Sequence, residues 1–283
     1  MQLSIRVVAK GPLGRAILLV ALLAGGPALA QTAQERHYCE GEDGTTLDQR
    51  IAGCSAVIRA GRDKGEKLAE AFQSRAIAYR LKGDYDRAIQ DYGHAIKLNG
   101  KFAAAFNNRG VAYDRKGEYD HAIADFDQAI RLKPTVEAYF NRGNAYLAKA
   151  QHAQAIDDYN AALKLQSDFG PALDNRCWAR AVVGILKPAL ADCNEALRLM
   201  PSNAATLDSR GFVYLKMSQF DAAVSDFDAV LRTDSKLPFA LYGRGLAKLK
   251  NEDSSGESEM AEAKTLQPDI AEEYARYGIA ESH

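Results

Sequence analysis

The chain has 283 residues, of which 47% are hydrophobic and 26% are charged, as in an ordinary folded protein of one or two domains. Its formal net charge is only -1, which argues against a nucleic-acid-binding protein, because such proteins usually carry an excess of basic residues. Proline is rare and Ala, Leu, Arg, Lys and Glu are abundant, so the composition favours helices.

Residues 1–30 are predicted to form a secretory signal peptide. This segment has basic residues and no acidic one, followed by the apolar run Ala16–Ala24 and by small residues before Gln31, where the mature chain would begin. The apolar run is shorter than the ~20 residues that span a membrane, although an uncleaved signal anchor is the alternative. We therefore expect an exported protein, in the periplasm of a Gram-negative bacterium, with no membrane span after cleavage.

Export would allow the four cysteines to form disulfide bonds. They fall into two couples that are close in sequence, Cys39 with Cys54 and Cys177 with Cys193, and three connectivities are possible. Bonds within the couples would each close a loop of about 15 residues, which stabilises a fold by roughly 3 kcal/mol in the chain-entropy model. Buried thiols are the alternative. A zinc site is disfavoured, because neither couple has CxxC spacing.

A pattern of about 34 residues repeats six times between residues 69 and 268. Each unit contains an arginine followed by a small residue, as in Asn108-Arg109-Gly110, and the small residues are separated by 34, 33, 34, 34 and 34 positions. In the first five units an alanine stands twelve positions after the small residue, and an aromatic residue or cysteine stands sixteen positions after it. The small residues are Ala76, Gly110, Gly143, Cys177, Gly211 and Gly245.

This spacing indicates pairs of antiparallel helices. The small residues and alanines would lie where the two helices approach most closely, with the aromatic residues filling the space beside them. Pro134 and Pro201 would end second helices, because proline lacks the N–H and clashes with the preceding turn. The pattern closely resembles the tetratricopeptide repeat, TPR. The resemblance implies an all-α fold, a right-handed superhelical solenoid of about six helix-turn-helix units with terminal capping helices.

The resemblance also bears on the units that depart from the pattern. In unit four, Cys177 and Cys193 replace the usual small and aromatic residues, and these positions face each other in a TPR helix pair. The resemblance therefore supports a disulfide bond between them. Unit six lacks the aromatic residues, and Gly256, Met260 and Ala263 fit its second helix only if one residue is deleted.

Capping segments are expected at both ends of the repeats. Residues 31–68 would contain an extended lead-in, tied through Cys39 to Cys54, and a capping helix over Leu47–Gly61 that resembles a lone second helix. Residues 269–283 would form a C-terminal capping helix and tail. Asp269 and Glu272 have the spacing of a capping box, and Gly278 would end this helix.

The arginines before the small residues are predicted to form a ladder of ion pairs. Each of the first five has an aspartate sixteen positions later, and the planar guanidinium group can donate two hydrogen bonds to one carboxylate. The pairs could lie within units or between neighbours, and the alternative is a basic stripe that binds an anionic ligand. The predicted ladder comprises Arg75, Asp91, Arg109, Asp125, Arg142, Asp158, Arg176, Asp192, Arg210, Asp226 and Arg244, with Glu259 as the counterpart of Arg244.

No catalytic motif is present: the sequence lacks GxSxG, HExxH and a phosphate-binding loop, and its five histidines do not cluster. We therefore expect no enzymatic activity, cofactor or metal. In TPR proteins the first helices line a concave groove that binds a protein or peptide partner. Carried over to this sequence, the groove candidates are Asn107, Asp114, Arg115, Phe140, Asn144, Asp174, Trp178, Asp208, Phe212, Lys216 and Tyr242.

The resemblance thus implies a periplasmic TPR adaptor that binds a peptide or partner protein. Aromatic side chains between short polar ones suit such a partner, although Phe140, Trp178 and Phe212 could instead pack against neighbouring helices. The basic clamp that some TPR proteins use for a C-terminal carboxylate is only partly matched, so that specificity is not predicted. The alternatives are a solenoid that self-associates into a homo-oligomer and, more remotely, an enzyme of unknown class.

Overall fold

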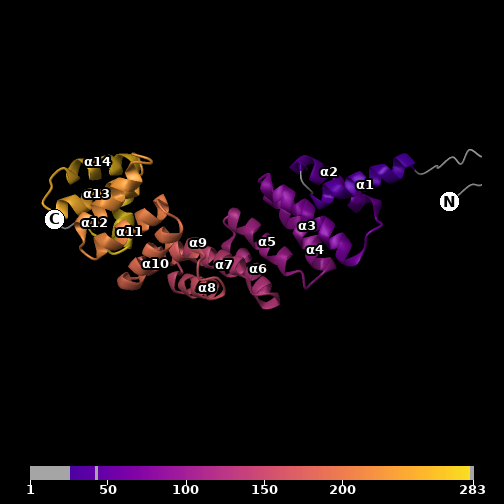
Figure 1. Cartoon of the computed structure of the whole chain (residues 1–283), viewed down its shortest axis with the longest axis horizontal. Helices are drawn as coiled ribbons and strands as arrows, with labels where there is room; N and C mark the ends of the chain where they lie inside the picture. The colour runs from indigo at the N-terminus through magenta and orange to yellow at the C-terminus, as the bar shows by residue number, and fades with distance from the viewer. Residues whose placement is uncertain (1–25, 42–43, 281–283) are drawn as a thin grey trace, which may run out of the picture. The chain divides into compact units, whose positions relative to one another are not determined.

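The computed structural model describes residues 26–41 and 44–280. These residues contain fifteen α-helices and no strand, so the prediction of an all-α fold is confirmed. In this described part, no helix is long and apolar enough to cross a membrane. The predicted signal peptide lies outside the described residues as far as residue 25. The chain divides into two compact units between Gly100 and Lys101 (Figure 1).

The N-terminal unit consists of two helix pairs. Helices α1 and α2 form the first pair, and α3 and α4 form the second. Their bounds are Gly26–Glu40 for α1, Leu47–Ala60 for α2, Gly65–Leu81 for α3 and Tyr85–Leu98 for α4.

The expectation of an extended lead-in is wrong, because the segment before α2 is the helix α1. Cys39 lies near the C-terminal end of α1 and forms a disulfide bond with Cys54 of α2. The two helices approach so closely at Gly53 that a Cβ there would lie 2.5 Å from the carbonyl oxygen of Glu35. The disulfide and this glycine together explain how a segment without a regular apolar pattern packs as a helix.

The C-terminal unit contains five helix pairs followed by one short helix. The pairs are α5–α6, α7–α8, α9–α10, α11–α12 and α13–α14, and each second helix also packs against the first helix of the next pair. Together with α3–α4 they make up the six repeat units. The bounds are Ala103–Arg115 (α5), Tyr119–Leu132 (α6), Val136–Ala148 (α7), His152–Leu165 (α8), Gly170–Val182 (α9), Leu186–Leu199 (α10), Ala204–Lys216 (α11), Phe220–Leu231 (α12), Pro238–Lys250 (α13), Gly256–Leu266 (α14) and Ile270–Arg276 (α15).

The small residue of each repeat lets the two helices of a pair meet. At Gly110 an added Cβ would lie 2.7 Å from the ring of Phe126, and at Gly143 it would lie 2.7 Å from the ring of Tyr159. Both rings are fully buried. In the fourth repeat, Cys177 replaces the glycine and Cys193 replaces the aromatic residue, and the two form a buried disulfide bond.

The C-terminal helix α15 is fixed by its apolar side chains. Ile270 and Tyr274 are fully buried, and the hydroxyl of Tyr274 donates to the carbonyl oxygen of Phe239 at 2.8 Å. The expectation of a capping box at the start of α15 is wrong: Asp269 occupies the N-cap position, but its side chain makes no capping hydrogen bond. Tertiary packing, rather than capping, holds this helix in place.

Candidate partner-binding face

In the first five repeats the arginine ladder consists of bidentate pairs between the two helices of each repeat. Nε and Nη2 of Arg109 each donate to a carboxylate oxygen of Asp125 at 2.7 Å, and the hydrogen bonds to this carboxylate raise the pKa of the arginine. The same two-bond geometry recurs in Arg75–Asp91, Arg142–Asp158, Arg176–Asp192 and Arg210–Asp226. The five aspartates are buried. We therefore interpret the ladder as part of the fold rather than as a binding stripe.

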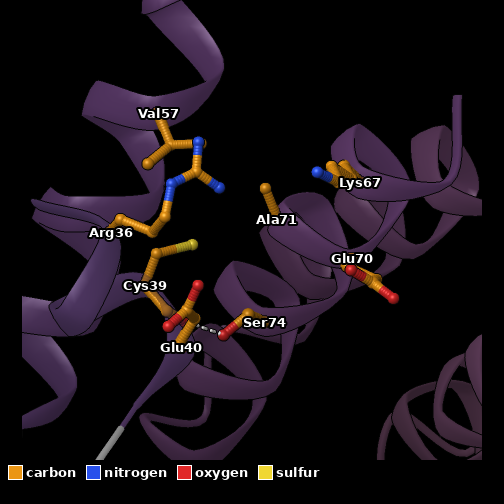
Figure 2. A pocket seen from close by; sticks show the side chains of 8 residues that line it. All are labelled: Arg36, Cys39, Glu40, Val57, Lys67, Glu70, Ala71 and Ser74. Carbon is orange, nitrogen blue, oxygen red and sulfur yellow. Dashed lines mark hydrogen bonds between the residues drawn. The ribbon is translucent and has the colours of Figure 1, made fainter. Parts of the chain in front are cut away.

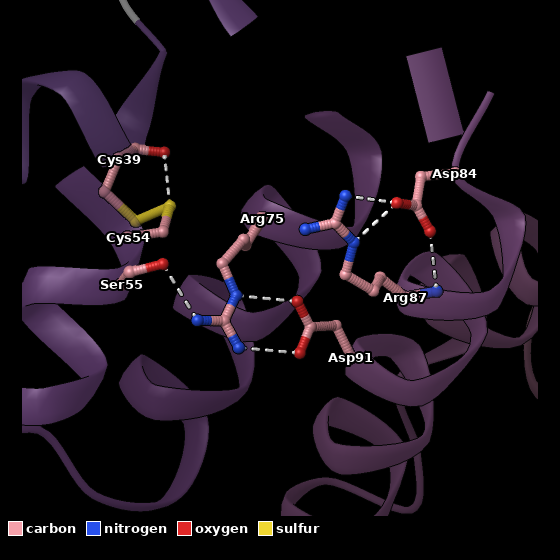
Figure 3. Close-up of polar contacts among 7 residues, drawn as sticks. All are labelled: Cys39, Cys54, Ser55, Arg75, Asp84, Arg87 and Asp91. Atoms are coloured by element: carbon pink, nitrogen blue, oxygen red, sulfur yellow. Dashed lines mark hydrogen bonds and ion pairs between the residues drawn. A yellow bond between two sulfur atoms is a disulfide. The ribbon is translucent and has the colours of Figure 1, made fainter. Parts of the chain in front are cut away.

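A further nitrogen of several arginines links one helix pair to the preceding one. Nη1 of Arg176 donates to Asn160 at 2.8 Å, and Nη1 of Arg210 donates to Asn194 at 2.9 Å. Equivalent bonds join Arg142 to Asp127, Arg244 to Asp228 and, in the N-terminal unit, Arg75 to Ser55 (Figure 3). The sequence analysis did not predict these bonds. In four of the repeats the sequence nevertheless has an Asn or Asp fifteen or sixteen positions before the arginine, which is the residue that accepts the bond. Sixteen positions before Arg109 the residue is Gly93, which has no side chain.

In the sixth repeat the arginine pairs with a glutamate, which also binds a lysine. Nε of Arg244 donates to Glu259 at 2.9 Å, and Nζ of Lys248 donates to the other carboxylate oxygen at 2.6 Å. The interval is fifteen rather than sixteen residues, in agreement with the one-residue deletion inferred from the sequence.

The predicted binding residues lie on one side of the first helices, which we call the first-helix face. It is formed by α5, α7, α9, α11 and α13, and asparagines connect the first three of these helices. The amide of Asn141 donates to Oδ1 of Asn107 at 3.2 Å, which joins α7 to α5. The amide of Asn175 donates to Oδ1 of Asn144 at 2.7 Å, which joins α9 to α7. Asn107 and Asn144 therefore hold the face together and remain partly exposed on it.

The C-terminal half of the first-helix face is covered by α15 and the residue after it. Phe212 and Tyr242 are buried, with exposures of 0% and 1%, so the expectation that they are open to a partner is wrong. Tyr242 contacts the ring of Tyr274 at 4.8 Å between centroids, and Phe212 contacts the same ring at 5.8 Å. Tyr277 packs edge-on against Trp178 at 5.1 Å. The aromatic anchors of these repeats thus bind the chain's own C-terminal segment.

Lys216 is also held by the C-terminal segment. Its Nζ donates to the carbonyl oxygens of Ala181 and Tyr277, each at 2.8 Å, and burial lowers its pKa. This cation therefore ties the end of α15 to α9 and α11 rather than pointing to solvent.

The first-helix face has an open part over α5, α7 and the start of α9. Arg115 is exposed, and Asp114, Phe140 and Asp174 are partly exposed. Phe140 packs edge-on against Phe169 at 5.2 Å, so one side of its ring belongs to the core. Burial raises the pKa of Asp114.

Two aspartates lie on the neighbouring helices α9 and α11, where the open and the covered parts of the face join. Asp174 of α9 and Asp208 of α11 occupy the same position in successive repeats, and Oδ1 of each is enclosed without a hydrogen-bond partner among the described residues. Burial raises the pKa of Asp208 to about 7, and the charges of Asp174 and Glu273 act in the same direction. Burial also raises the pKa of Asp174, against the opposing effect of the Thr206 and Ser209 hydroxyls.

Family models match the repeats by sequence. A tetratricopeptide repeat model matches residues 103–135 and 136–169, and a TPR repeat model matches residues 77–117. Residues 77–169 of the chain are therefore tetratricopeptide repeats.

Solved structures support the same TPR fold. YrrB, described as "a TPR protein with an unusual peptide-binding site", is 25% identical over 63% of this chain and 93% of its own, with a TM-score of 0.53. The pilus biogenesis factor PilW is 19% identical over 74% of this chain and 97% of its own, with a TM-score of 0.62. A TPR protein from Parabacteroides merdae is 17% identical over 89% of this chain and 99% of its own, also with a TM-score of 0.62. No curated protein matches the chain by sequence.

The N-terminal unit contains a pocket of about 610 Å³ between α1, α2 and α3 (Figure 2). Its wall carries two cations, Arg36 and Lys67, and two acids, Glu40 and Glu70. The Ser74 hydroxyl donates to the carbonyl oxygen of Cys39. Sequence analysis did not predict this pocket, because α1 was not recognised as a helix.

Proposed function

We propose that this TPR protein is an exported interaction module that binds a partner polypeptide on the open part of its first-helix face. The observation that carries the proposal is the division of that face. Its C-terminal half already holds a polypeptide segment, α15 with Tyr277, whereas Phe140, Asn144 and Asp174 at the adjoining helices keep exposed surface. A surface that packs one segment of chain has the chemistry to pack another.

The side chains of the open part suit a polypeptide. Phe140 offers an aromatic anchor of the kind that dominates interface energies, and Asn107 and Asn144 offer amide donors and acceptors next to it. YrrB, whose described feature is a peptide-binding site, is similar to this chain over most of its own length, which supports a peptide as the partner.

The proposed compartment is the periplasm. Its support is the pair of disulfide bonds, Cys39–Cys54 and Cys177–Cys193, because such bonds persist in oxidising compartments and are rare in the cytosol. The signal-peptide pattern of residues 1–30 points the same way.

Site-specific photocrosslinking in cells tests the proposal. The photoreactive amino acid p-benzoylphenylalanine would replace Phe140 or Arg115 on the first-helix face, and the exposed Gln128 on the second helix α6 as a matched control. We expect a discrete crosslinked protein from the two face positions and none from Gln128, and the purified partner should then bind the purified chain. Equal crosslinking from all three positions would contradict the proposal. Crosslinking only to another copy of the chain would establish self-association instead.

A further inference from the structure

We infer that the Cys39–Cys54 disulfide bond is a redox switch. A dithiol that enters the neighbouring pocket reduces this bond, and the reduction releases helix α1 from α2 and α3. The Cys177–Cys193 bond stays oxidised under the same conditions. The inference is independent of the proposed function, because it concerns only the N-terminal unit.

Access to the sulfur atoms distinguishes the two disulfide bonds. Cys39 lines the pocket between α1, α2 and α3, and its sulfur points toward the space between Arg36 and Ala71 (Figure 2). Cys39 is 5% exposed, whereas Cys177 and Cys193 are both 0% exposed. The rate of thiol–disulfide exchange depends on access, because a thiolate must reach one sulfur atom. A reductant therefore reaches Cys39 in the folded chain, but it reaches Cys177 only after the fourth repeat opens.

The pocket accommodates a small dithiol. Its volume of about 610 Å³ lies within the range of roughly 300–1,000 Å³ that is usual for small-molecule sites. Lys67, Glu70 and Ser74 of α3 give its wall a polar side opposite α1. A polar reagent with two thiol groups therefore meets both the space and the polar surface that it needs next to Cys39.

The reduction transfers two electrons from the dithiol to the chain. One thiolate of the dithiol attacks Sγ of Cys39, the bond to Sγ of Cys54 breaks, and Cys54 leaves as a thiolate that takes up a proton. The second thiol of the reagent loses its proton and attacks the mixed disulfide. This step releases Cys39, which also takes up a proton, and leaves the reagent as a cyclic disulfide. The chain gains two thiols and the dithiol is oxidised.

Helix α1 has few other contacts that would hold it once the bond is broken. Among its described side chains, from Ala33 to Glu40, only Cys39 is buried. Arg36 forms an ion pair with Asp63, but the arginine side chain is 47% exposed, and exposed pairs contribute little. Two hydrogen bonds reach carbonyl oxygens at and just beyond the end of the helix. The covalent bond is therefore the main attachment of α1.

The release of α1 uncovers apolar surface. Cys39 and Cys54 pack with Val57 of α2 and Ala71 of α3 in one buried cluster, and Ile58 lies beside it. Because α1 contributes only Cys39 to this cluster, its departure leaves Val57 and Ala71 without their cover. The redox state of one bond thus controls whether this surface is accessible.

Timed reduction with dithiothreitol tests the first step. The purified chain, with both disulfide bonds formed, is sampled over time, free thiols are alkylated with iodoacetamide, and mass spectrometry quantifies each labelled cysteine. We expect the cysteines of the Cys39–Cys54 bond to be labelled at least about tenfold faster than those of the other bond. That bond is the matched control, because its sequence separation is 16 residues against 15. Equal rates, or reduction of neither bond, would overturn the inference.

Hydrogen exchange of backbone amides tests the release of α1. After selective reduction, the amides of α1 should exchange at least about tenfold faster, while those of α11 and α12 should not change. Cys39→Ser with Cys54→Ser should show the same fast exchange without reductant, whereas Cys177→Ser with Cys193→Ser should leave α1 protected. Reoxidation with glutathione disulfide should restore the protection of the reduced chain. If α1 stays protected after reduction, or if its protection does not return, the bond is not a switch.

Discussion

Gly143 lies directly against the ring of Tyr159, at a distance where an added Cβ would be 2.7 Å from Cε1. We expect Gly143→Ala to lower the free energy of unfolding by about 1–3 kcal/mol, because the overpacked ring must move. This loss should appear although alanine is the better helix former by about 1 kcal/mol. Urea unfolding measures it, and Gly100→Ala is the control because a Cβ there meets nothing within 4 Å. Equal stabilities of the two variants would contradict the prediction, because they would show that α7 and α8 can move apart to accept the added methyl group without loss of stability.

The buried ion pairs should matter far more than the exposed ones, and α10 allows the comparison on a single helix. Asp192 is 7% exposed and binds both Arg176 and Arg180, whereas Glu195 is 42% exposed and pairs with Arg198. We expect Asp192→Ala to cost about 3–5 kcal/mol of unfolding free energy, because it removes the carboxylate that neutralises the largely buried Arg176 and Arg180. Glu195→Ala should change little, since water already screens that pair. Chemical denaturation followed by circular dichroism measures both, and similar losses would place the ladder among ordinary surface pairs.

The disulfide of the fourth repeat should be replaceable by the packing of the other repeats. Cys177→Ser with Cys193→Ser removes the bond and leaves a poorly filled space, so we expect a loss of about 3 kcal/mol in unfolding free energy. Cys177→Gly with Cys193→Phe reproduces the Gly110–Phe126 contact and should recover much of that loss. Thermal unfolding under oxidising conditions compares the variants. If the glycine–phenylalanine variant is no more stable than the serine variant, the disulfide has a role beyond packing.

Asp208 should make stability fall as the pH rises. Its pKa is about 7 in the folded chain, against about 3.9 for an unperturbed aspartate. Between these two values the folded state binds more protons than the unfolded state, so unfolding becomes easier as the pH increases, and above pH ~7 the penalty is complete. Asp208→Asn should therefore be more stable than the unmodified chain at pH 8, by at most roughly 4 kcal/mol.

The same comparison below pH ~4 should show no difference, because Asp208 is then protonated in both states. Melting temperatures from pH 4 to pH 8 provide the measurement. The exposed Asp157→Asn controls for the general loss of a negative charge. A constant difference between Asp208→Asn and the unmodified chain across this range would mean that the carboxyl group is not buried in solution.

The repeats could be predicted from the sequence because their determinants are local and recur. One arginine or one glycine would mean little, but six arginines in register, each with an acid fifteen or sixteen residues later, indicate the pairing that Arg109 makes with Asp125. The resemblance to the tetratricopeptide repeat could be recognised for the same reason, because its small and aromatic residues also recur in register.

The rest depends on contacts between distant parts of the chain. Nothing in the residues of α15 indicates that Tyr274 will bury Phe212, which lies 62 positions earlier. The open part of the first-helix face was for this reason predicted too large. The helix α1 was missed because its packing depends on a glycine and a cysteine of α2, Gly53 and Cys54, rather than on an apolar pattern of its own.

The hydrogen bonds between successive helix pairs have a consequence for rearrangements of the gene. Arg176 bonds to Asn160 and Arg210 bonds to Asn194, each over sixteen residues. Deleting residues 170–203, one full period of 34, would bring Arg210 to the distance from Asn160 that Arg176 now has. The excision removes Cys177 and Cys193 together, so no unpaired thiol remains. Unequal recombination that removes one whole repeat would therefore leave an arginine and an asparagine at the new junction in the register that they have between other repeats.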